Sequence, residues 1–96
     1  MALTRSFKDT VQTRVASDPA FKEALLTEGV NALLGGDLDT GKAVLRSYIN
    51  ATVGFETLSA STGTPTKSLM RMFGPRGNPN ASNLFAVLQT LQRSSG

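Results

Sequence analysis

The chain has 96 residues, a length that fits one small domain, and it contains neither cysteine nor histidine. It therefore has no disulfide framework and no thiolate or imidazole metal ligand, and it lacks the commonest general base, so we expect no metal, no cofactor and no enzymatic activity. The apolar runs are too short to span a membrane, and none follows the first five residues as a signal peptide requires. We expect a cytoplasmic protein.

The net charge of +3 is unevenly distributed along the chain. Residues 1–56 carry six bases against seven acids, a net −1. Residues 57–96 carry no acid and four bases, a net +4; the bases are Lys67, Arg71, Arg76 and Arg93. A segment of this kind suits a surface that faces a polyanion. A chance distribution in a short chain is the alternative.

Helix signals run through the chain, and no apolar-polar alternation or Asn-Gly turn predicts a strand. A first helix, capped by Thr4, is predicted from apolar residues at every fourth position, Leu3, Phe7, Val11 and Val15. Asp18 and Pro19 have the residue types of an N-cap and a first helical residue. They begin a second predicted helix, which stops at Gly35-Gly36.

The rest of the chain holds four more predicted helices. The first of them opens at Asp39 or Thr40, ends at Gly54, and buries the stripe Val44, Leu45, Tyr48 and Ile49. Shorter helices follow at about 55–62, 65–73 and 81–92. Asn80 caps the last one, which buries Leu84, Val87, Leu88 and Leu91. We therefore expect an all-α fold of five or six helices.

The second predicted helix has apolar residues on two opposite sides. One side carries Phe21, Ala24, Leu25 and Ala32, and the other carries Leu26, Val30 and Leu33. Either the helix lies between two neighbours of its own domain, or one side forms a subunit or partner interface. We interpret residues 1–36 as an amino-terminal helical extension packed on the same domain as residues 37–93.

Between Phe55 and Phe73 the sequence predicts two short helices joined by a tight turn. The first helix has one packed face, formed by Phe55, Leu58, Ser59 and Thr62. Gly63 ends it in the left-handed conformation. Thr64 then caps the next helix, and Pro65 is its first residue. So tight a turn makes the two helices cross steeply, which is the geometry that presents a second helix to the DNA major groove.

The second of these helices has a buried and a basic side. Leu69 is the centre of the buried side, with Met72 and Phe73 beside it. The opposite side and the exposed amino-terminal end carry Thr66, Lys67, Met70 and Arg71. Lysine and arginine donate to guanine, and threonine and methionine contact base edges or a thymine methyl, so these four are the candidate base-reading residues. A solvated charged side on an ordinary core helix is the alternative.

The lambda-repressor-like (Xre/Cro) family has the helix-turn-helix pattern Leu-Ala-x-x-x-Gly-x-x-x-x-Ser-hydrophobic, and the chain resembles it at Leu58-Ser59-x-x-Thr62-Gly63-x-x-x-x-Ser68-Leu69. Ser59 and Thr62 replace the family's usual alanine and valine, which are close to them in size. The following loop and last helix also resemble the family, at Asn78-Pro79-x-x-x-Asn83-Leu84-x-x-Val87-Leu88-x-x-Leu91. The resemblance implies base reading by Thr66, Lys67 and Arg71, and phosphate contacts by Ser68, Arg76 and Asn78.

A narrower resemblance covers about residues 20–92 and is to the addiction-module antidote proteins, the antitoxins of toxin–antitoxin pairs. It includes the amino-terminal helical pair, Gly36-Asp37, Thr62-Gly63, Lys67-Ser68-Leu69 and Gly77-Asn78-Pro79. It implies a regulator that represses its own operon by binding a double-stranded DNA operator as a homodimer, and that neutralises a RelE-like toxin. Two half-sites about 34 Å apart suit such a dimer. The candidate dimer or partner surface is Leu26, Val30, Leu33 and Phe85.

Three other functions stay open. The basic side at Lys67 and Arg71 suits a helical interaction module that binds an acidic protein, and the chain also suits a phage-type repressor that has no toxin partner. An enzyme is disfavoured because Asp37, Asp39 and Glu56 have no spacing that pairs them. Gly35-Gly36 lacks the Gly-Lys-Ser/Thr of a phosphate-binding loop and is interpreted as a helix stop.

Overall fold

The computed structural model describes the backbone of residues 5–95 and the side chains of residues 11–93. Over residues 5–95 the chain forms six helices and no strand, which confirms the all-α prediction. The predicted first-helix residues Leu3 and Thr4, and the side chain of Phe7, lie outside the described part. The helices are α1 (Arg5–Ser17), α2 (Pro19–Leu34), α3 (Leu38–Ala51), α4 (Gly54–Thr62), α5 (Thr66–Met72) and α6 (Ala81–Ser95).

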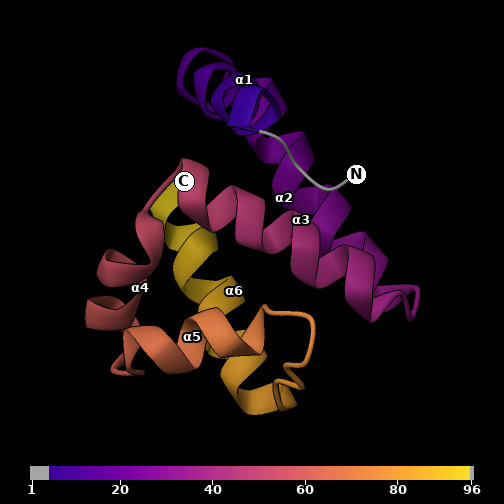
Figure 1. The fold of residues 1–96 in the computed structure, drawn as a ribbon, viewed down its shortest axis with the longest axis vertical. Helices are drawn as coiled ribbons and strands as arrows, with labels where there is room; N and C mark the ends of the chain where they lie inside the picture. The colour runs from indigo at the N-terminus through magenta and orange to yellow at the C-terminus, as the bar shows by residue number, and fades with distance from the viewer. Residues whose placement is uncertain (1–4, 96) are drawn as a thin grey trace.

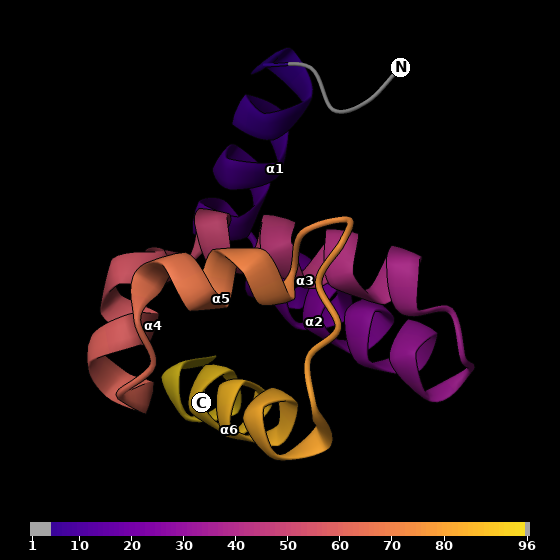
Figure 2. The same cartoon turned by 60° about the horizontal axis from the view of Figure 1, so that its bottom comes forward.

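The helices are arranged around a central pair. In Figures 1 and 2, α2 and α3 lie side by side, α1 projects from one end of this pair, and α4, α5 and α6 gather on the other side of α3. The loop after α5 leads back to α6, as Figure 2 shows. Within residues 5–95, no helix is both long enough and apolar enough to cross a membrane.

Two predicted N-caps are confirmed by hydrogen bonds. The Asp18 carboxylate accepts from the backbone N–H groups of Ala20 (3.1 Å) and Phe21 (3.2 Å), with Pro19 as the first residue of α2. The Asn80 side chain accepts from the N–H of Asn83 at 2.8 Å. These short-range bonds satisfy donors that a helix start otherwise leaves without a partner.

Both predicted ends of α3 need correction. The helix begins at Leu38, not at Asp39 or Thr40, because the Asp37 carboxylate accepts from the N–H of Thr40 at 3.2 Å and takes the capping position itself. Asp39 instead lies in the first turn, where a carboxylate interacts favourably with the helix dipole. At the other end, α3 stops at Ala51. Gly54, with φ +79°, opens α4 and does not close α3.

One hydrophobic core joins α3 to α4, α5 and α6. Its buried members are Leu45, Tyr48, Ile49, Phe55, Leu58, Leu69, Met72, Phe73, Val87 and Leu91. Leu84 and Leu88, both predicted in the core, lie at its margin as half-buried residues, and Val44 is also only half-buried. From α2, Leu25, Leu26 and Leu33 pack against the same cluster. The first 36 residues thus contribute to the core of the rest of the chain.

Two glycines allow α2 and α3 to approach closely. A Cβ added at Gly41 of α3 would lie 2.5 Å from Cδ2 of Leu33 and 3.3 Å from the carbonyl oxygen of Gly29. A Cβ added at Gly29 of α2 would lie 2.9 Å from Cδ2 of Leu45. Leu33 therefore occupies the space that the missing Gly41 side chain leaves, and it packs within its own chain.

Candidate nucleic-acid interface

The turn between α4 and α5 is held by hydrogen bonds back to α4. Gly63 has φ +76°, as predicted, and its N–H donates to the carbonyl of Ser59 at 2.9 Å. The Ser59 hydroxyl donates to the carbonyl of Thr64 at 2.6 Å. The Thr62 hydroxyl accepts from the Thr64 N–H at 3.3 Å and donates to the Leu58 carbonyl at 2.9 Å. The two small polar residues of α4 therefore fix the direction in which the chain leaves it.

The predicted start of α5 needs a correction. Thr64 does not cap the helix, because its N–H and carbonyl are both bound to α4 side chains. Pro65 takes the N-cap position in an extended conformation (φ −55°, ψ 143°), and Thr66 is the first helical residue. No side chain caps α5. The Pro65 carbonyl accepts from the Leu69 N–H at 3.0 Å, the first bond of the helix.

The two sides of α5 are as the sequence predicted. Leu69 is fully buried, and Met72 and Phe73 are buried beside it, with Phe73 one position past the end of the helix. On the opposite side Lys67, Met70 and Arg71 are exposed. More than half of the Met70 surface (54%) is exposed. Thr66, expected at the exposed amino-terminal end of the helix, is instead half-buried, and so is Ser68.

The loop from residue 73 to residue 80 carries two of the candidate phosphate-binding residues. Arg76 and Asn78 are both exposed in it. Gly77 lies against the carboxyl-terminal end of α5, because a Cβ placed there would collide with the carbonyl oxygens of Arg71 and Met72. The loop therefore runs close beside the last turn of α5 (Figure 2), and Arg76 precedes the glycine that makes this contact.

Two basic residues of α3 hold this loop, and the sequence reasoning missed them. The Lys42 side chain is buried, and its ammonium donates to the carbonyls of Gly74 (2.9 Å) and Gly77 (2.8 Å). The Arg46 guanidinium donates to the Phe73 carbonyl at 3.4 Å, a long and weak bond. We call Lys42 and Arg46 the α3 clamp. The sequence spacing puts Lys42 on the buried side of α3, three residues before Leu45, but it does not indicate which carbonyls the ammonium binds.

Carboxylates do not neutralise the basic side chains around α5. Among residues 11–93, whose side chains are described, the ion pair present joins Arg14 to Asp18 at 3.7 Å. The Arg14 guanidinium also lies 4.4 Å above the ring of Phe21, so it belongs to the junction of α1 and α2. Lys67, Arg71 and Arg76 have no such partner among these residues and keep their charge available to an anionic ligand.

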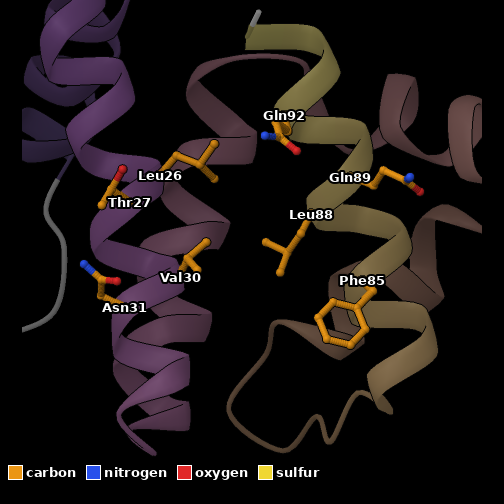
Figure 3. A pocket seen from close by; sticks show the side chains of 8 residues that line it. All are labelled: Leu26, Thr27, Val30, Asn31, Phe85, Leu88, Gln89 and Gln92. Atoms are coloured by element: carbon orange, nitrogen blue, oxygen red, sulfur yellow. The ribbon is translucent and has the colours of Figure 1, made fainter.

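The candidate partner surface is brought together in part. Leu26 and Val30 of α2 and Phe85 of α6 line one groove between the two helices (Figure 3). Leu33 is not among its lining residues, because it packs at Gly41 of α3.

A comparison of the chain with models of protein families, with curated proteins and with solved structures found no match among any of the three.

Proposed function

We propose that this protein is a sequence-specific transcriptional regulator that binds double-stranded DNA and reads the major groove with α5. The observation that carries the proposal is the exposed side of α5, where Lys67, Met70 and Arg71 lie opposite the buried Leu69. The major groove is wide enough to admit a helix of this kind. Its buried side fixes it to the domain, and its basic side chains can donate to the acceptor atoms of guanine.

The residue types on this side favour base reading over a merely charged surface. Lysine and arginine donate to the O6 and N7 atoms of guanine, and the apolar Met70 suits a thymine methyl group. Arg76 and Asn78, on the adjacent loop, suit the phosphate backbone. The α3 clamp supports the same function, because a reading helix discriminates between bases only when its position relative to the backbone contacts is fixed.

Repression of an operon and neutralisation of a RelE-like toxin stay predictions from the resemblance to antidote proteins. Neither is needed for the DNA-binding proposal, which rests on α5 and on the loop and clamp beside it. Binding of an acidic protein by the same basic side is the competing function. It predicts affinity for polyanions without preference for a base sequence.

Selection from a pool of random duplexes, followed by fluorescence anisotropy on the enriched duplex, tests the proposal. We expect Lys67→Ala and Arg71→Ala each to lose about 1–3 kcal/mol of binding free energy and to relax the choice of base at one position. Arg76→Ala should weaken binding to all sequences about equally, and should lower the slope of log K against log salt by about one.

Arg93→Ala is the matched control, because it removes the same charge from an exposed site near the carboxyl-terminal end of α6, away from α5 (Figure 1). It should leave base preference unchanged and reduce affinity less than Arg71→Ala. Failure of selection to enrich any sequence would contradict the proposal. So would a change of base preference in Arg76→Ala that is absent from Arg71→Ala.

A further inference from the structure

The exposed side of α5 combines hydrogen-bond donors with one apolar side chain and has no strong acceptor. Lys67 and Arg71 donate hydrogen bonds and accept none. Of the three large apolar residues of the helix, Leu69 and Met72 are buried, which leaves Met70 exposed beside the two bases. Its thioether sulfur is only a weak acceptor. The exposed side therefore has no group that accepts a strong hydrogen bond from a base.

This chemistry limits which base edges the helix can read. In the major groove guanine presents the acceptors O6 and N7, and thymine presents the acceptor O4 and a C5 methyl group, whereas adenine and cytosine each present an amino donor. Lys67 and Arg71 match the acceptors of guanine, and the uncharged, apolar Met70 matches the methyl group. A base contact by Met70 therefore consists of burying a methyl group. It depends little on whether the pyrimidine has a keto or an amino group at C4.

The spacing along α5 places Met70 over the same few base pairs as Lys67. Residues three positions apart on a helix are neighbours, with about 5–6 Å between their Cβ atoms. Successive base pairs of a duplex lie about 3.4 Å apart along its axis. The base that Met70 contacts should therefore lie within about two base pairs of the base that Lys67 contacts.

We infer that Met70 reads the C5 methyl group of a pyrimidine, so that α5 accepts 5-methylcytosine at the position where it prefers thymine and disfavours unmethylated cytosine there. The two methylated bases carry the methyl group on the same ring carbon and differ at C4, which Met70 does not distinguish. Methylation of a cytosine at this position then strengthens DNA binding. The inference rests on the proposed function, because it concerns a base that α5 contacts.

Duplexes that differ by one methyl group test the inference. The position is first located as the one at which Met70→Ala relaxes the base preference in selection from random duplexes, and we expect the parent protein to prefer thymine there. Fluorescence anisotropy then compares two matched pairs at this position, thymine with uracil and 5-methylcytosine with cytosine. In each pair the parent protein should bind the base that carries the methyl group about fourfold more tightly, which is the effect of burying one carbon.

Two variants show whether Met70 causes this difference. In Met70→Ala the preference within each pair should disappear, because a preference that persisted would come from the duplex itself. Arg71→Ala is the matched control. It should bind every duplex more weakly and keep the same ratio within each pair, since Met70 is still present. Met70 is exposed, so the melting temperature of Met70→Ala should match that of the parent.

The outcomes separate the inference from the proposed function. A preferred DNA sequence that the parent binds equally well with and without the methyl group overturns the inference and leaves the proposed function standing. The same conclusion follows if Met70→Ala relaxes no position, if it keeps the methyl preference, or if its position lies outside the base pairs that Lys67→Ala and Arg71→Ala affect. If selection enriches no sequence at all, the proposed function fails, and the inference fails with it.

Discussion

Replacement of Lys42 by methionine isolates the role of the α3 clamp. Methionine keeps an unbranched side chain of similar length in the buried position, and it removes the ammonium that bonds the carbonyls of Gly74 and Gly77. The core around the stem of residue 42 therefore stays filled, and the two hydrogen bonds to the loop are lost.

The expected loss of stability follows from these two bonds. A hydrogen bond to a charged group contributes about 1.5–3 kcal/mol net of the exchange with water. The lower value applies here, because Gly74 and Gly77 are half-buried and water reaches the carbonyls once the ammonium is gone. Two bonds then give about 3 kcal/mol. For a domain of this size that corresponds to a melting temperature lower by about 12–24 °C.

Thermal melts followed by circular dichroism measure this difference, with Lys67→Met as the matched control. Lys67 is exposed on α5, so the same chemical change there should alter the unfolding free energy by less than about 0.5 kcal/mol. Amide hydrogen exchange adds a local measure, since the Gly77 N–H that bonds the Gly74 carbonyl should exchange faster in Lys42→Met. If Lys42→Met has the same melting temperature as Lys67→Met, and its Gly77 amide exchanges no faster, the clamp does not hold the loop.

Two further substitutions test the packing beneath the candidate interface. Leu69→Ala should lower the unfolding free energy by about 2–5 kcal/mol in a denaturant titration, because Leu69 is fully buried. Leu34→Ala, at an exposed position, should lower it little. If the two variants had equal unfolding midpoints, the buried side of α5 would not be centred on Leu69. Gly77→Ala should destabilise by about 1–3 kcal/mol, because its Cβ collides with backbone such as the Met72 carbonyl. In Gly74→Ala the new Cβ lies 3.4 Å from its nearest neighbours, so a melt of that control should stay near the parent's.

Features set by neighbouring residues were predictable from the sequence. The caps at Asp18 and Asn80 and the left-handed Gly63 each depend on a few successive residues, and each was placed correctly. The buried side of α5 was placed correctly as well, because helical periodicity fixes which side chains lie opposite Leu69. The all-helical fold follows from the same local signals.

Where several neighbouring residues could each cap a helix, the sequence does not show which of them does so. Asp37, Asp39 and Thr40 are all good N-cap residues, and Asp37 takes the role because its carboxylate reaches the N–H three positions ahead. Thr64 has the residue type of a cap, but the hydroxyls of Ser59 and Thr62 bind its backbone and keep it in the turn. In both cases the outcome is decided by a hydrogen-bond geometry that composition does not reveal.

Contacts between distant parts of the chain were the least predictable. Lys42 reaches carbonyls 32 and 35 residues further along, and nothing in the spacing of either segment indicates the other. The two apolar sides of α2 gave a similar ambiguity. Leu33 turned out to fill the space above Gly41, while Leu26 and Val30 line the groove. The sequence shows that both sides of α2 are apolar. Which side is buried within the chain depends on how α2 crosses α3.

The choice of carbonyls as partners for Lys42 bears on the proposed function. A buried cation usually has a carboxylate partner, and a carboxylate in the loop after α5 would satisfy Lys42 equally well. That carboxylate would also lie beside Arg71 and Arg76 and would repel DNA phosphates within a Debye length of about 8 Å. The carbonyls of Gly74 and Gly77 accept the hydrogen bonds of the ammonium and add no net charge. The absence of acids from residues 57–96 therefore suits both the exposed side of α5 and the clamp beneath it.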